Sequence, residues 1–138
     1  MHLRFILGHA ALLCACASAP PAQYIVQAAP STAPDTERGL YDIILQLARD
    51  PAAQAKLAPS ARVIFHGEET TSEPLTDARS ELSWVSEASS EETTVRCVAA
   101  ELRCSIEQPG GETIFRFAHA GEGAERRVVL SEIESSEP

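Results

Sequence analysis

The sequence predicts an α+β fold, with an N-terminal helix and a short second helix packed on an antiparallel sheet of five or six strands in meander order. Two observations lead to this prediction. Apolar residues first recur with a helical period, and from Ala61 onward they alternate with polar residues, as in half-buried strands. Short turn sequences separate the later apolar runs, so successive strands are expected to pair with one another. A sheet with helices on one face buries the apolar sides of both elements.

Residues 1–15 have the features of a secretion signal. Arg4 precedes a mostly apolar run, Phe5–Leu13, which is nine residues long. As a helix this run would span about 14 Å, whereas a bilayer core requires about 20 residues. We therefore expect an export signal that is removed, and not a transmembrane helix.

The sequence Leu13-Cys14-Ala15-Cys16 resembles the lipobox of bacterial lipoproteins, in which Leu stands three places before the modified Cys and a small residue directly before it. The resemblance implies cleavage before Cys16 and attachment of acyl chains, such as palmitate, to the new N-terminal residue. Ala17, next to the anchor, is not Asp, and this implies sorting to the periplasmic face of the outer membrane. The alternative is ordinary cleavage of the signal, which would leave a soluble periplasmic or secreted protein.

The mature chain is expected to begin with a Pro/Ala-rich linker at 16–34, anchored by lipid. Four of the residues in 17–34 are prolines, which favour an extended chain over a helix. A single α+β domain is expected at 35–133, followed by a polar, disordered tail at 134–138.

The domain is expected to start with two helices. Asp35 or Thr36 can cap the first helix, whose buried face carries apolar residues at i, i+3, i+4 and i+7, namely Leu40, Ile43, Ile44 and Leu47. Asp50 and Pro51 end this helix and start the second, because Asp is a good cap and Pro fits the first helical turn. The second helix is expected at 52–58.

Strands are expected wherever the apolar period is two and turn residues flank the run. The expected strands are 62–66, 81–86, 93–99, 102–108, 111–118 and 126–133. Residues 67–80 are expected to form a loop, with a helical turn near 75–79.

Cys97 and Cys104 are expected to form a structural disulfide across a hairpin. Folding the chain at Ala100–Glu101 places Cys97 opposite Cys104 on one face, where directly opposed Cβ atoms lie about 4.5–5.5 Å apart. An even pair of thiols in an exported chain favours oxidation. The alternatives are a redox-active pair, which usually has Cys-x-x-Cys spacing at a helix start, and a metal site, for which nearby ligands are lacking.

The segment Asp50–Gly67 resembles the start of nuclear-transport-factor-2-like (NTF2-like, SnoaL-like) domains, where a helix runs through a Leu-x-Pro-x-Ala sequence into a strand ending in His-Gly. The order of helices and strands also suits that family. The resemblance implies a curved sheet wrapped around the helices and enclosing an apolar pocket. The family's usual catalytic Asp, His and Tyr constellation is not evident in this sequence.

Candidate pocket residues are His66, Trp84 and His119. His66, followed by Glu68 and Glu69, could form a base–acid pair or bind a divalent metal, but no third ligand is fixed at a suitable spacing. Both histidines are more simply solvated strand ends, and Trp84 is more simply a core residue. No nucleophile motif or phosphate loop occurs, so we expect no catalysis, no cofactor and no metal.

Charge bears on the class of partner. Eleven basic against twenty acidic residues give a net charge of −9, and removal of Arg4 with the signal gives −10. This balance argues against nucleic acid, since phosphate neutralisation requires a basic patch. We expect a non-enzymatic domain that binds an envelope protein, and an inhibitor or immunity protein for a basic hydrolase would fit. The alternatives are an NTF2-like domain that binds or transforms a small molecule, and an accessory lipoprotein of a secretion or pilus system. The oligomeric state is open.

Overall fold

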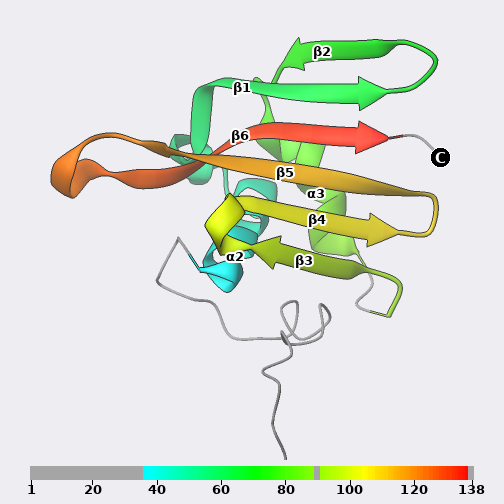
Figure 1. Ribbon diagram of the computed structural model, residues 1–138, viewed down its shortest axis with the longest axis horizontal. Coiled ribbons are helices and arrows are strands. Elements are labelled where there is room, and N and C mark those ends of the chain that lie inside the picture. The colour runs from blue at the N-terminus through cyan, green and yellow to red at the C-terminus, as the bar shows by residue number, and fades with distance from the viewer. Residues whose placement is uncertain (1–35, 89–90, 137–138) are drawn as a thin grey trace, which may run out of the picture.

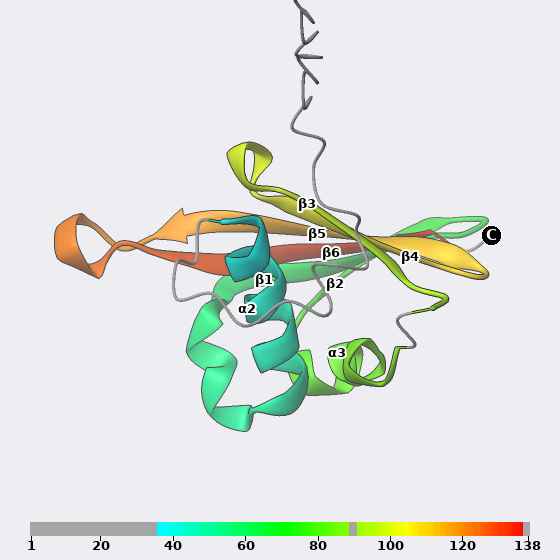
Figure 2. The ribbon, with the colours of Figure 1, turned by 90° about the horizontal axis from the view of Figure 1, so that it is seen from below.

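Among the residues that the structure describes, two α-helices lie on one face of a six-stranded sheet and none lies on the other, which we call the helix-free face (Figures 1 and 2). The computed structural model describes residues 36–88 and 91–136. The elements in chain order are α2 (Glu37–Arg49), η1 (Pro51–Lys56), β1 (Leu57–His66), β2 (Thr70–Pro74), α3 (Ala78–Glu87), β3 (Thr94–Val98), η2 (Ala99–Glu101), β4 (Arg103–Gln108), β5 (Gly111–Ala120), η3 (Gly123–Glu125) and β6 (Arg127–Ser136). The α+β class expected from the sequence is confirmed.

The capping residues of the sequence fix both ends of α2. The Thr36 hydroxyl accepts a hydrogen bond from the Gly39 N–H at 3.0 Å, which satisfies one of the free donors of the first turn. At the other end, the Asp50 N–H donates to the Gln46 carbonyl at 2.8 Å, and the Asp50 side chain caps the next segment by accepting from the Ala52 N–H at 2.9 Å. That segment, η1, is a short 3-10 helix, and the chain enters β1 at Leu57, earlier than expected.

The sheet is mixed, with strand order β2-β1-β6-β5-β4-β3. The strands β3 to β6 form the expected antiparallel meander, but β1 lies beside β6 and runs parallel to it. A meander order for the whole sheet is therefore wrong. The segment between the edge strands β2 and β3 includes α3, so the chain crosses under the sheet from one edge to the other (Figure 2).

The strand expected at 81–86 is wrong, because these residues lie in helix α3. The buried residues of α3 are Ala78, Leu82 and Val85, spaced as i, i+4 and i+7 along one helical face. Asp77 caps the helix by accepting from the Ser80 N–H at 3.1 Å. The apparent alternation in this segment is thus a short part of a helical pattern.

Two further expectations are corrected by strand pairing. Residues 70–74, expected to be loop, form the edge strand β2, in which Arg62 of β1 binds the Ser72 hydroxyl and carbonyl at 2.7 and 3.0 Å. The boundary expected between the domain and its tail, at residues 133 and 134, lies too early in the chain, since β6 continues to Ser136. The last residue of β6, Ser136, pairs with His66 of β1 on one side and with Glu112 of β5 on the other, so both neighbours extend the strand.

The core fills the space between the helices and the sheet. Its largest fully buried side chains come from both layers: Leu40, Ile44, Leu47, Leu82, Val95, Ile106, Phe115 and Leu130. Burial of a large apolar side chain contributes about 1.5–3 kcal/mol, so these residues dominate the packing of the layers.

Candidate functional site

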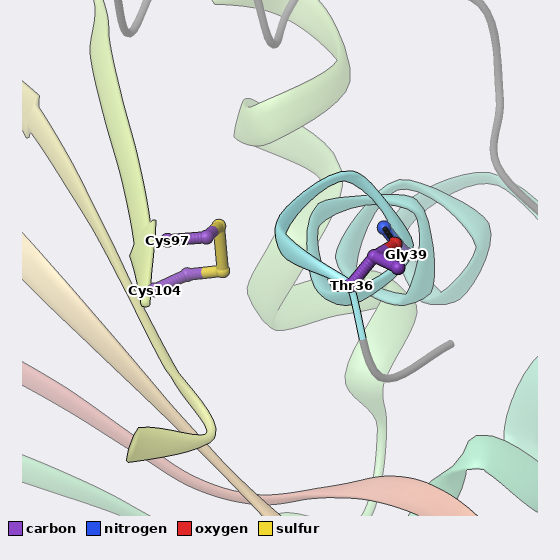
Figure 3. Close-up of a disulfide and its surroundings, with 4 residues drawn as sticks. All are labelled: Thr36, Gly39, Cys97 and Cys104. Carbon is purple, nitrogen blue, oxygen red and sulfur yellow. Dashed lines mark hydrogen bonds between the residues drawn. A yellow bond between two sulfur atoms is a disulfide. The ribbon is translucent and has the colours of Figure 1, made fainter. Parts of the chain in front are cut away.

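The disulfide between Cys97 and Cys104 is present and buried beneath α2 (Figure 3). The two residues are direct partners across β3 and β4, with Cα atoms 4.0 Å apart, as the hairpin pattern predicts. Cys97 is 6% exposed and Cys104 is fully buried. A buried bond of this kind is hard for an external thiol to reach, which favours a structural role over a redox-active one.

The hairpin turn differs from the two-residue turn expected at Ala100–Glu101. The strands end at Val98 and resume at Arg103, and the turn between them is the 3-10 segment η2 with Leu102 in a left-handed conformation at φ 48°. The Leu102 side chain packs against the core. Its carbonyl accepts from the Phe117 N–H at 2.8 Å, which ties the turn to β5. Tertiary contacts therefore replace the turn chemistry that the sequence lacks.

Trp84 lines an open hollow at the end of the sheet where β4 turns into β5. The hollow has a volume of about 320 Å³. It is lined by the indole of α3, the turn between β4 and β5, and the end of β6, through the residues Trp84, Gln108, Pro109, Gly110, Gly111, Glu112, Thr113, Ser135 and Ser136. An indole beside hydroxyl, amide and carboxylate groups suits a small polar ligand with one apolar face.

His66 lies on the helix-free face and belongs to a different group of residues. Its Nε2 is 2.6 Å from Glu134 Oε1 on β6, and its Nδ1 is 3.2 Å from the Thr70 hydroxyl on β2. Arg116 of β5 is within 3.4 Å of both Glu132 and Glu134. We call these five residues, His66, Thr70, Arg116, Glu132 and Glu134, the polar network.

The network favours the charged form of Glu134. The hydrogen bond from His66 lowers the pKa of Glu134 below its ordinary value of 4.5, and Arg116 acts in the same direction against a partial cost of burial. The acidic neighbour of His66 is therefore Glu134, 68 positions along the chain, and not Glu68 or Glu69. Within 36–88 and 91–136, no group of three or more His, Cys, Asp or Glu side chains could hold a metal.

The structure does not bring the three candidate pocket residues together. His119 is exposed near the end of β5, opposite Val128 of β6, while His66 pairs with Ser136 and Ser136 with Glu112 of β5. Seven residues of strand between Glu112 and His119 correspond to about 24 Å. Of the three, only Trp84 lines the hollow.

A second hollow, of about 210 Å³, lies along α2 and was not indicated by the apolar pattern. Arg38 Nε is 3.0 Å from Asp42 Oδ1, and its guanidinium lies 5.5 Å from the centre of the Tyr41 ring. Burial raises the pKa of Tyr41, against the opposing effect of Arg38 and Arg49. The spacing of Arg38 and Asp42 as i and i+4 is the sequence signal for this pair.

The lipidation residue, Cys16, lies outside the residues that the structure describes. Neither α2 nor α3 is long and apolar enough to cross a bilayer.

No protein-family model, no curated protein and no solved structure matches this chain.

Proposed function

We propose that this chain is an exported lipoprotein, anchored through Cys16 to the periplasmic face of the outer membrane, whose α+β domain binds an envelope protein without catalysing a reaction. The observation that carries the proposal is the buried disulfide between Cys97 and Cys104. Disulfides form and persist in oxidising compartments and are rare in the cytosol. The signal and lipobox-like sequence at 5–16 supply the export route and the anchor.

The acidic surface gives the partner its expected chemistry. Glu68, Glu69 and Glu73 are exposed on the hairpin formed by β1 and β2. In a chain of net charge −9 they form a projecting acidic element that a basic surface can contact. A basic cell-wall hydrolase, or another basic envelope protein, fits this element by charge.

The anchor is tested by metabolic labelling with radioactive palmitate and by fractionation of the envelope. We expect label in the wild type and in Cys14→Ser, because a small residue still stands two places before the modified cysteine. Cys16→Ser should lose both the label and the membrane attachment, since one acyl-bearing residue provides the anchoring. Equal labelling of the two variants would refute anchoring at Cys16.

The partner is tested by binding to envelope extracts at low salt. Replacement of Glu68, Glu69 and Glu73 with Gln should weaken capture of the bound protein, and the same change at Glu101, Glu122 and Glu125 should not. Capture that resists 0.5 M salt, or that is equal in both triple variants, would contradict a charge-guided partner.

A second candidate function is binding of a small molecule in the hollow beside Trp84, as the NTF2-like alternative expects. This hollow is open, mostly polar and without His66, whereas the resemblance implies an enclosed apolar pocket. Trp84 is the single tryptophan of the chain, so its fluorescence reports directly on this hollow. A ligand that binds there should change the emission of the wild type, and Gln108→Ala should weaken its binding. A ligand whose affinity is the same in Gln108→Ala and wild type would exclude the hollow as its site.

A further inference from the structure

The helix-free face of the sheet has an unusual arrangement of charge on β4 and β5. Cys104, Ile106 and Phe115 are buried beneath the helices, so the residues that alternate with them point to the helix-free face. Three cross-strand pairs lie on that face, namely Arg103 with Arg116, Ser105 with Ile114, and Glu107 with Glu112. A basic pair and an acidic pair therefore flank a small central pair.

Each outer pair places like charges directly opposite one another, which destabilises a sheet. Arg116 is relieved by Glu132 and Glu134. In the part of the chain that the structure describes, Arg103, Glu107 and Glu112 have no ion pair. The fold thus bears an electrostatic cost for which the single chain shows little compensation. Local rules that a fold breaks in this way often mark a binding surface.

We propose that this face binds the same face of a second copy of the chain. The two copies are related by a two-fold axis that lies between the sheets, along the row of Ser105 and Ile114. Rotation about this axis places the acidic row of one copy over the basic row of the other. Glu107 then faces Arg103 of the second copy and Glu112 faces its Arg116, and symmetry repeats both contacts.

Charge complementarity favours a second copy over other occupants of this face. A basic partner would satisfy the acidic row and repel the basic row, and an acidic partner would do the reverse. The rows are four residues apart along β4, or about 14 Å, so one compact charge cannot serve both. Rotation about an axis parallel to the strands would place Glu over Glu, so charge also fixes the relative direction of the two sheets.

The centre of the face can pack without a charge conflict. Ile64 of β1 and Ile114 of β5 lie in the same row, and both are half-buried. Facing sheets pack about 10 Å apart, which brings such side chains into contact. The interface is flat and rich in charge, so a dissociation constant of about 1–100 μM is expected.

Two residues oppose the arrangement. Arg96 of the edge strand β3 and Glu134 of β6 lie in the central row. Each would therefore approach the same residue of the second copy, which has the same charge. Glu134 is held by His66 and Arg116, and Arg96 is exposed at the sheet edge, where its long side chain reaches solvent. Against these two like-charge approaches, the proposed dimer forms four opposite-charge contacts, two between Glu107 and Arg103 and two between Glu112 and Arg116.

The test uses single charge reversals in the full-length chain, studied by sedimentation equilibrium in density-matched detergent. Arg103→Glu places two glutamates against each other twice in the dimer, and Glu107→Arg does the same with arginines. Each should raise the dissociation constant at least about tenfold. A mixture of the two variants should form a heterodimer, and the double swap Arg103→Glu/Glu107→Arg should restore the homodimer.

The reversal Arg103→Glu also removes the repulsion between Arg103 and Arg116 within one chain, so the folded monomer should not lose stability in urea. Glu122→Arg, in the exposed turn before η3, changes the net charge without touching the face and should leave the dimer intact. A wild-type chain that stays monomeric at 200 μM would overturn the proposal. A dimer that neither reversal weakens, or reversals that fail to complement each other, would also overturn it.

Discussion

Glu134 shows how a single carboxylate can be held in its charged form by neighbours from other strands. His66 of β1 is 2.6 Å from one of its oxygens, and Arg116 of β5 is 3.4 Å from the other. A group whose pKa is lowered by folding stabilises the folded state above its ordinary pKa, here 4.5. This contribution is lost as the pH falls through the lowered pKa of the folded state.

We therefore predict that Glu134→Gln is destabilising at pH 7 and becomes neutral in acid. Three-quarters of the Glu134 side chain is buried but the pair is still near solvent, so the loss should not exceed about 1 kcal/mol. Urea unfolding of both proteins between pH 7 and pH 3 measures the difference, which should close below pH 4.5. Glu125→Gln is the control, and a gap that is independent of pH would contradict the account.

The sequence could identify His66 as a candidate but not its partner. Local spacing pointed to Glu68 and Glu69, whereas the contact with Glu134 depends on the parallel pairing of β1 with β6. That pairing joins the first and last strands of the domain, and no local pattern encodes it. By contrast, Cys97 and Cys104 are close in sequence, and their alternation with polar residues was sufficient to fix the register.

The hairpin of β3 and β4 is stabilised by the disulfide between Cys97 and Cys104. The disulfide joins residues seven positions apart and faces α2, which packs over it (Figure 3). A loop of this length limits the unfolded chain by roughly 2–3 kcal/mol in the chain-entropy model. The bond also closes a hairpin whose turn residue Leu102 has a positive φ.

We predict that Cys97→Ala/Cys104→Ala lowers the free energy of unfolding by roughly 2–3 kcal/mol. Urea denaturation under oxidising conditions measures the loss, and the wild type treated with reductant under denaturing conditions should show a similar one. A loss below about 1 kcal/mol would mean that the packing of α2 on the sheet, and not the cross-link, holds this hairpin.

Helix α3 is the element that the sequence pattern assigned wrongly. Leu82 and Trp84 alternate as in a strand, but the longer spacing of Ala78, Leu82 and Val85 is helical. Asp77, whose side chain accepts from the Ser80 N–H, is the local signal of a helix start, and it lies outside the strand-like alternation at 81–86. Strand and helix patterns overlap in such short apolar runs.

Because residues 78–87 form a helix, removal of its N-cap, Asp77, should lower the free energy of unfolding. Asp77→Ala should lower stability by about 1 kcal/mol, because it removes the acceptor for the Ser80 N–H. Asp77→Asn keeps a capping side chain and should lose much less. Thermal unfolding of the two variants distinguishes the cases, and equal stability would contradict a capped helix at this position.

The two faces of the sheet differ in their chemistry. The helices cover one face and pack over the disulfide. The opposite face carries a basic pair, Arg103 with Arg116, and an acidic pair, Glu107 with Glu112. The sequence predicted the fold class, α2 and the disulfide hairpin from local periodicity. It could not predict the strand order, the hollow beside Trp84 or the polar network, because all three depend on strands that meet only in the folded sheet.

We propose that the chain is exported, acylated at Cys16 and oxidised between Cys97 and Cys104. Intact mass spectrometry of the membrane-extracted protein, alkylated before and after reduction, tests all three parts together. We expect a chain that begins at Cys16, carries acyl groups, and takes up two alkyl groups only after reduction. A chain without acyl groups, or one whose two thiols are alkylated before reduction, would contradict it.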